Sequence, residues 1–289
     1  FNAILGKKSS RDYCSKNQRV RKISRYSKNI SLKTGKIILY DEPTVPEIQL
    51  QRLKKFLTEI FPVEIETRGN IFQGSSNNIS KKIAGCRIFD LKKPFKKHSP
   101  SIEDVQIELE NKDMSEREEM TLYDGFEFHN AITELIPMNE NIRGTLHIIF
   151  TNKLTCTFDE SDFRYHARAL IGTNPTIIST TGIIEAPAKP KQYYLDLMTN
   201  FSEKKVEETK KKYTGEFLEY HDSRISEITE GYLLQAIIYY ETGEAFCDHR
   251  DCRLFNAHWQ KDLFFSQLEN KRFCKKHQEI LNELKNQNQ

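Results

Sequence analysis

Apolar and polar positions follow two different periods between residues 36 and 67, and they predict a strand, a helix and a second strand. Residues 36–40 form a short apolar run (KIILY) that suits a buried strand. Residues 46–61 carry apolar side chains near helical spacing, and Pro62 is expected to end that helix. Residues 63–67 (VEIET) alternate, as a half-buried strand does. Strand, helix and strand within about thirty residues are typical of a βαβ unit.

Four more strands are predicted in the middle of the chain. Residues 144–150 (GTLHIIF) and 154–158 (LTCTF) are expected to pair as a β-hairpin across residues 151–153. Residues 165–171 and 176–180 supply two further strands. Strands that first alternate with helices and then follow one another predict an α/β (α+β) fold.

Loops and helices are predicted around these strands. Residues 74–80 are rich in Ser and Asn and favour a loop. Residues 103–119 hold eight acidic and two basic side chains, which favours a solvated, partly helical insertion. Helices are expected over residues 193–213 and 223–240, and Gly243 suits the end of the second.

The composition indicates a folded protein with a hydrophobic core and argues against a polytopic membrane protein. Hydrophobic residues make up 37% of the chain, with 18 Phe and 12 Tyr, which is enough apolar mass for a core. No stretch approaches the ~18 uninterrupted apolar residues of a spanning helix, so a polytopic membrane protein is not expected.

The charge is divided unevenly along the chain. Residues 1–36 carry eleven basic side chains against one acidic, a net charge of +10, whereas the remaining residues hold 33 basic and 40 acidic side chains, a net of −7. We expect the basic arm to be disordered in isolation, because it offers little apolar surface to bury. It could be a plain tail, a targeting segment, or an arm that contacts nucleic acid.

The cysteines and histidines near the C-terminus have the spacing of a metal site. Three of the six cysteines lie in the last 43 residues, in the pattern C-x₄-C…C-x₂-H. The predicted ligands are Cys247, Cys252, Cys274 and His277. Two such pairs can wrap one Zn²⁺, and four protein donors leave no open position for water, so the site would be structural. His249 and His258 lie nearby and could replace His277.

The same clustering bears on the compartment. Cysteines gathered for metal ligation, with too few elsewhere for a disulfide framework, favour a reducing environment. We therefore expect a cytoplasmic protein.

Residues 236–281 resemble the C-terminal region of the archaemetzincins, zinc metallopeptidases of the metzincin group. In that family H-E-x-x-H-x-x-G-x-x-H precedes a cysteine, four residues, C-x-M and a later C-x-x-C. Gly243 matches the family glycine, and Cys247 and Cys252 match its first two cysteines. The resemblance implies a metzincin-like mixed sheet for residues 37–289, with residues 241–281 as the segment that binds a structural zinc.

A second likeness is to an uncharacterised archaeal group described as metallopeptidases. Three short segments carry it: residues 40–43 (YDEP), 165–168 (YHAR) and 185–190 (EAPAKP).

The departures from the archaemetzincin pattern fall on its catalytic residues. The three zinc-binding histidines of the family fall on Ala236, Tyr240 and Phe246, and its catalytic glutamate falls on Ile237. Ala, Ile and Phe can neither ligate zinc nor move a proton, and one Tyr does not replace three imidazoles. The resemblance therefore implies a protein that has lost its catalytic zinc.

A polar pocket is a further candidate site. His166 and Arg168 are two residues apart, so they share one face of the predicted strand. Together with Glu185 and His129 they could line a peptide-binding groove or hold a relocated metal ion. A strand histidine is more often an ordinary core or edge residue.

Two functions remain open from the sequence. The first is a metallopeptidase-like protein with one structural Zn²⁺ per chain, catalytically inactive, that binds a peptide or protein partner. The alternative is a zinc-stabilised binding module that contacts nucleic acid through residues 1–36. Neither involves a membrane.

Overall fold

The computed structural model describes residues 32–73, 77–111, 120–172, 174–199 and 202–286. Its strands form a five-stranded sheet in the order β2-β1-β4-β8-β7 and a three-stranded sheet in the order β3-β5-β6. The strands are β1 (Lys36–Tyr40), β2 (Glu64–Arg68), β3 (Leu122–Asp124), β4 (Thr145–Thr151), β5 (Leu154–Asp159), β6 (Arg164–Arg168), β7 (Leu170–Ile171) and β8 (Thr176–Ser179). β1, β2, β4 and β8 run parallel, and β7 is antiparallel to β8. β3 is parallel to β5, and β6 is antiparallel to β5.

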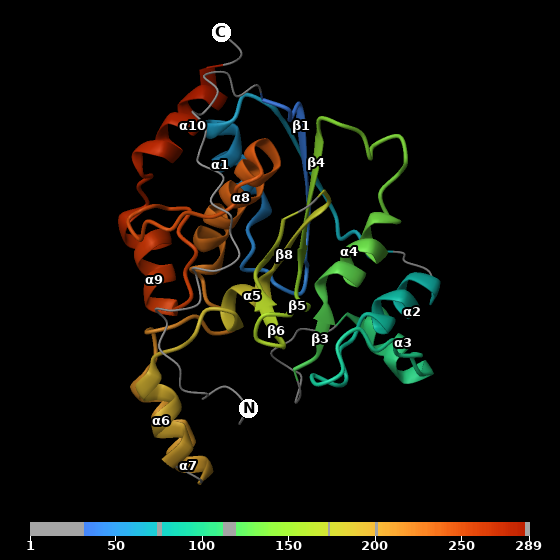
Figure 1. The fold of residues 1–289 in the computed structure, drawn as a ribbon, viewed down its shortest axis with the longest axis vertical. Helices are drawn as coiled ribbons and strands as arrows, with labels where there is room; N and C mark the ends of the chain where they lie inside the picture. Colours follow the sequence, from blue (N-terminus) through green and yellow to red (C-terminus); the bar gives the residue numbers. More distant parts are fainter. Residues whose placement is uncertain (1–31, 74–76, 112–119, 173, 200–201, 287–289) are drawn as a thin grey trace.

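Helices cover both faces of the larger sheet (Figure 1). They are α1 (Leu50–Ile60), α2 (Asn77–Gly85), α3 (Ile102–Glu110), α4 (Gly125–Thr133), α5 (Thr180–Glu185), α6 (Lys191–Thr199), α7 (Glu203–Lys212), α8 (Ile225–Thr242), α9 (Gln260–Phe264), the π-helix η2 (Phe265–Asn270) and α10 (Lys275–Lys285). No helix in the described residues is long and apolar enough to cross a membrane.

The strand β1 shows how the sheet separates two cores. Ile37 and Leu39 join the core that includes α1, α8 and α10, whereas Ile38 and Tyr40 join the core beneath α2 and α4. Successive side chains of a strand point to opposite faces, so a run that is apolar throughout is buried on both. The predicted α/β fold with a mixed sheet is confirmed.

The βαβ prediction is also confirmed, with shifted boundaries. β1 is the strand expected over 36–40, and β2 lies one residue later than 63–67. The helix begins at Leu50 rather than at residue 46, because the chain first makes turns in which Val45 and Ile48 donate backbone N–H groups to Glu42 and Val45.

The predicted hairpin between residues 144–150 and 154–158 is wrong. β4 lies between β1 and β8 and so has no free edge, and β5 belongs to the other sheet. The hydroxyls of Ser179, Thr180 and Thr181 donate to the carbonyls of residues 153, 151 and 152, at 2.7, 3.1 and 2.6 Å. These donors lie 26 to 29 residues further along the chain. They hold residues 151–153 in a path that leads from β4 in one sheet to β5 in the other, so the two strands do not form a hairpin.

Two other element predictions need correction. The single helix expected over residues 193–213 is two helices, α6 and α7, because Lys212 and Tyr213 fold back to bond Asp196. The loop expected over 74–80 contains the start of α2, and residues 74–76 lie outside the described part. The acidic insertion at 103–119 is helical in α3, as expected in part, and its residues 112–119 also lie outside the described part.

The predicted disordered arm falls mostly on residues 1–31, which lie outside the described part of the chain. Residues 32–36 belong to the folded domain instead. Thr34 is buried, its backbone N–H donates to Glu241 at 3.0 Å, and Lys36 begins β1. A buried carboxylate therefore anchors the start of the sheet.

Candidate metal centre

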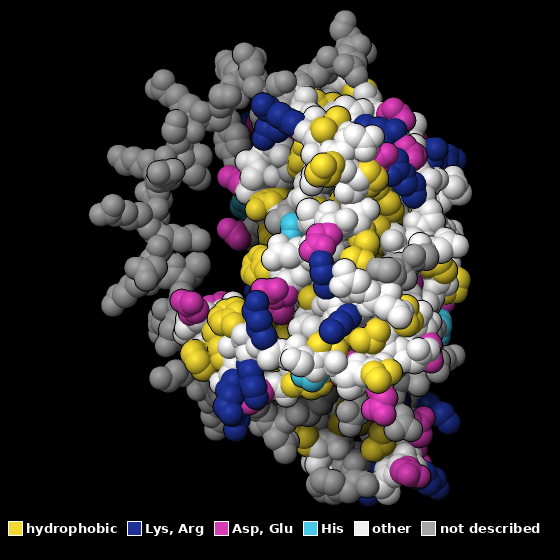
Figure 2. All heavy atoms as spheres, turned by 90° about the vertical axis from the view of Figure 1, so that its right-hand side faces the viewer, with side chains coloured by type: hydrophobic (Ala, Val, Ile, Leu, Met, Phe, Trp, Pro, Cys, Tyr) yellow, Lys and Arg dark blue, Asp and Glu magenta, His cyan; other side chains and the backbone are white. Residues whose placement is uncertain are grey.

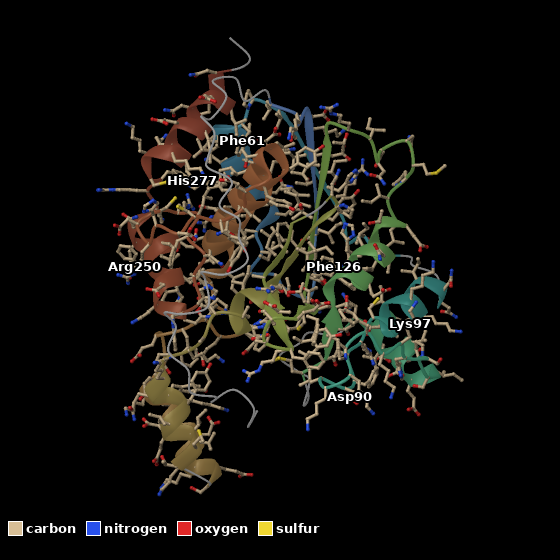
Figure 3. All side chains as sticks on the ribbon, viewed as in Figure 1. Phe61, Asp90, Lys97, Phe126, Arg250 and His277 are labelled. Carbon is tan, nitrogen blue, oxygen red and sulfur yellow. The ribbon has the colours of Figure 1, made fainter. Side chains whose placement is uncertain are left out.

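The four predicted ligands come together between α8, α9 and α10. Cys247 and Cys252 lie on the loop that follows α8, Cys274 is the N-cap residue of α10, and His277 lies in the first turn of that helix. In Figure 3, His277 and the loop residue Arg250 lie on the same side of the large sheet, the side of α8. Gly243 ends α8 in the left-handed conformation (φ 81°), which is the role its position predicted.

The four donor atoms are gathered at nearly the spacing of a tetrahedral zinc site, with the two His277 distances shorter than the ideal. The Cys247 and Cys274 sulfurs are 3.8 Å apart, and His277 Nδ1 is 3.1 Å from Cys274 Sγ and 3.4 Å from Cys252 Sγ. All four atoms lie within 4.8 Å of one another. Donors at ~2.0–2.3 Å from one Zn²⁺ lie ~3.5–3.8 Å from each other at the corners of a tetrahedron. A sulfur separation of 3.8 Å also excludes a disulfide, whose S–S bond is ~2.05 Å long.

The loop between the first two cysteines is held by its own backbone. Cys247 N–H donates to the Leu254 carbonyl at 2.8 Å, and Cys252 N–H donates to the His249 carbonyl at 3.0 Å. The N–H of His249 also points at Cys247 Sγ, at 3.4 Å. An N–H aimed at a sulfur favours its thiolate form, because hydrogen bonding to the charged form lowers the cost of ionisation.

Burial shifts the pKa values of two of the thiols and the imidazole in the absence of a metal ion. It raises the pKa of the Cys252 thiol to about 12 and also raises the pKa of the Cys247 thiol. It lowers the pKa of His277, which keeps the imidazole neutral and able to ligate. A buried group of neutral thiols gains from a divalent cation, which displaces their protons and compensates the thiolate charge.

The two alternative histidine ligands do not join this group. His249 and His258 are exposed, and neither belongs to the cluster of donors that the described residues bring together. His277, by contrast, is 1% exposed. Of the three histidines that the sequence left open, His277 is the one that lies with the three cysteines.

The four positions that the resemblance aligned with the archaemetzincin catalytic residues lie on or just after α8. Ala236 and Ile237 are fully buried in the core shared with α1. Tyr240 accepts a hydrogen bond from the Gly144 N–H at 3.3 Å, and Phe246 is largely exposed. The nearby carboxylate, Glu241, is 3% exposed and accepts the N–H groups of residues 33 and 34. Ala236 and Ile237 therefore serve packing, and Tyr240 and Glu241 hold backbone groups of the sheet side.

The predicted polar pocket is not assembled by direct contacts. His166 Nε2 lies 3.0 Å from Asp162, Arg168 Nε donates to Thr157 at 2.7 Å, and Glu185 lies 3.6 Å from Lys189. Within the described residues no hydrogen bond or ion pair joins His166, Arg168 and Glu185 to one another. His129 lies apart on α4, where burial lowers its pKa.

A second group of possible metal donors surrounds His166. Asp159, Asp162 and His166 bring their donor atoms within 4.8 Å of one another on the β5–β6 hairpin. Sequence reasoning missed the two aspartates because it paired residues 154–158 with the strand before them. The Asp162–His166 ion pair accounts for this exposed arrangement.

A buried ionic network was also missed. Lys153, 2% exposed, lies 3.0 Å from Glu108 Oε2, and Arg87 Nε donates to Glu108 Oε1 at 2.8 Å. Burial alone would raise the pKa of Glu108, but Lys153 and Arg87 hold that pKa below its usual range. No local spacing links these residues, because they come from three separate segments: the loop after α2, helix α3 and the connection between β4 and β5.

Comparison with known proteins assigns the family. The chain belongs to the probable metallopeptidase family (DUF6775), whose model matches residues 33–284. The match does not single out the archaemetzincins. No curated protein matches the chain significantly.

One solved structure is similar over most of the chain. It is a zinc-dependent peptidase from Methanocorpusculum labreanum, with 12% sequence identity and a TM-score of 0.38, covering 86% of this chain and 100% of that chain. A TM-score this low does not establish a shared fold.

Proposed function

We propose that this member of the metallopeptidase family has lost its hydrolytic zinc, keeps one structural Zn²⁺, and acts by binding a peptide or protein partner. The convergence of Cys247, Cys252, Cys274 and His277 on one point is the observation that supports the structural zinc. Four protein donors fill a tetrahedral ion and leave no position for the water that a hydrolytic zinc must activate.

The loss of hydrolysis is inferred from the chemistry of the side chains at the archaemetzincin-like positions. The eight histidines of the chain include no two that are four residues apart, the spacing by which a helix offers two imidazoles to one ion. Ala236 and Ile237 occupy the matching helix positions and are buried among apolar side chains. A reducing compartment suits a thiolate-rich site, and for this reason we propose a cytoplasmic location.

Metal analysis and a cleavage assay on the same preparation test this function. We expect one zinc per chain and no hydrolysis of casein or of a mixed peptide library, with or without 1,10-phenanthroline. Two zincs per chain, together with cleavage that the chelator abolishes, would contradict the proposal and point to a displaced site, with Asp159, Asp162 and His166 as the first residues to substitute.

The nucleic-acid alternative rests on the basic arm alone. The net charge of +10 over residues 1–36 favours phosphate contacts whose strength falls with salt. Deleting residues 1–31 and measuring oligonucleotide binding between 50 and 200 mM salt tests it, because binding through the arm is lost in the deletion variant at every salt concentration.

A further inference from the structure

A cleft opens on the face of the large sheet opposite the Cys/His cluster. It has a volume of about 410 Å³ and lies between α2, α4 and the loop that follows α2. In Figure 3, Lys97, Asp90 and Phe126 lie on this side of the sheet, and His277 lies on the other. Cavities of ~300–1,000 Å³ are typical of sites that hold small molecules or a few residues of a peptide.

Phe95 and Tyr165 line the cleft, Phe158 packs against both of them, and Phe163 packs against Phe158. Phe95 and Phe163 are 64% and 62% exposed, and their backbones adopt positive φ angles of 61° and 56°. Their rings contact Phe158 at centroid distances of 5.4 and 5.1 Å, and the Phe95 N–H donates to the hydroxyl of Tyr165. We call Phe95, Phe158, Phe163 and Tyr165 the aromatic cluster.

The positive φ angles and the exposure of Phe95 and Phe163 both lower the stability of the protein without a partner. A left-handed backbone costs a non-glycine residue ~1–2 kcal/mol, and leaving a phenylalanine in water forgoes ~1.5–3 kcal/mol of burial. Clustered exposed apolar side chains that surround a cavity mark interaction sites more often than chance placement does. Figure 2 shows this face of the molecule, where hydrophobic side chains interrupt the charged ones.

The loop beside the aromatic cluster is basic. Residues 92–97 contain four lysines and no acid (KKPFKK), in a body whose net charge outside residues 1–36 is negative. Lys93 lies 3.7 Å from Asp90. Lys96 and Lys97 line the cleft, and neither makes an ion pair or hydrogen bond within the part of the chain that the structure describes.

The carboxylates of the cleft are largely engaged. Glu134 is paired with Lys82, and Asp124 caps α4 by accepting the N–H groups of residues 126 and 127. With Asp90 and Glu127 they place four acids along the cleft. A phosphate backbone carries a charge at every nucleotide and would meet these acids along its length, whereas a peptide can confine a few carboxylates to Lys96 and Lys97 and place apolar side chains on the aromatic cluster.

We propose that this cleft docks a linear acidic segment of a partner protein, with carboxylates against Lys96 and Lys97 and an apolar side chain against Phe95. This inference rests on the partner-binding part of the proposed function and names the chemistry of the partner. The cleft lies across the large sheet from α8, the helix that the archaemetzincin resemblance aligned with catalytic residues.

Fluorescence anisotropy with defined probes tests the inference. The probes are a fluorescein-labelled twelve-residue peptide with two adjacent glutamates, flanking leucine and phenylalanine and otherwise uncharged residues, its lysine-for-glutamate counterpart, and a labelled twelve-nucleotide oligothymidylate. We expect the full-length, zinc-loaded protein to bind the acidic peptide best. Lys96→Glu/Lys97→Glu should weaken binding at least tenfold, because two attractions become two repulsions. Lys204→Glu/Lys205→Glu is the matched control, because it makes the same charge change on exposed residues of α7. The affinity of this variant for the acidic peptide should stay within twofold of wild type.

A second variant separates the aromatic contribution. Phe95→Asn keeps a residue that tolerates positive φ but removes the ring, and it should weaken binding severalfold without changing the salt dependence. Failure of wild type to bind the acidic peptide, or equal binding by Lys96→Glu/Lys97→Glu, overturns the inference. Preferential binding of the oligothymidylate that the same substitutions abolish would identify a nucleic-acid site instead. These outcomes leave the zinc count unchanged, so failure of docking is distinguishable from failure of the structural-zinc proposal.

Discussion

Replacing Cys252 by serine should remove the zinc and lower stability in the same step. Cys252 is fully buried, and its sulfur lies 3.4 Å from His277 Nδ1. A ligand that binds only the folded state stabilises it by RT ln(1 + [L]/Kd), which is about 4 kcal/mol when free zinc exceeds Kd a thousandfold. Unfolding the roughly 240 residues that the structure describes carries an entropy of about 0.5 kcal/mol per kelvin, so the loss should lower Tm by about 8 °C.

Differential scanning calorimetry with and without EDTA measures this effect. Wild type should lose about 8 °C in EDTA, whereas Cys252→Ser should start near the lower value and not respond to the chelator. Cys156→Ser is the matched control: Cys156 is 2% exposed and lies outside the cluster, so this variant should keep the full EDTA response. An EDTA response in Cys252→Ser equal to that of wild type would refute the reasoning.

Three further predictions concern the rest of the fold. Lys153→Met leaves the buried Glu108 with one cation fewer and should cost ~3–5 kcal/mol in urea unfolding, whereas Lys210→Met at an exposed pair should cost less than ~1 kcal/mol; equal costs would contradict the network. Glu241→Gln weakens the anchor on residues 33 and 34, so trypsin should cut after Lys33 faster than in wild type; an unchanged rate would show that the anchor contributes nothing. Hydrogen bonds from Arg68 and Lys36 lower the pKa of Glu66 from 4.5 to about 2, so its contribution to stability is present above pH 4.5 and disappears as the pH falls towards 2. In metal-free buffer the Tm of Glu66→Gln should therefore fall less than the Tm of wild type between pH 4.5 and pH 2. Equal falls in the two proteins would contradict this role of Glu66.

The group of three cysteines and one histidine could be predicted because its donors lie close together in the sequence. One pair of donors lies on the loop after α8 and the other at the start of α10, so only these two segments have to meet. Gly243 marks the end of α8 in the sequence. The sequence favoured His277 but left His249 and His258 open, because the position of each imidazole depends on which side chain the first turn of α10 buries.

The features that sequence reasoning missed depend on distant contacts. β4 and β5 have the pattern of a hairpin, but the strands that occupy both edges of β4 and the hydroxyls that hold the crossover come from elsewhere in the chain. Asp196 likewise turns one expected helix into two by bonding Lys212 and Tyr213 across the gap. The cleft beside the aromatic cluster unites three segments, and only its run of lysines was visible in the sequence.

X-ray absorption at the zinc edge, combined with the metal count, tests the central claim most directly. A closed structural site held by Cys247, Cys252, Cys274 and His277 predicts one zinc per chain with three sulfurs at ~2.3 Å and one nitrogen at ~2.0–2.1 Å. A first shell of nitrogen and oxygen alone, or a second zinc with a bound water, would contradict the account of a metallopeptidase-family protein that has kept a structural zinc and lost the hydrolytic one.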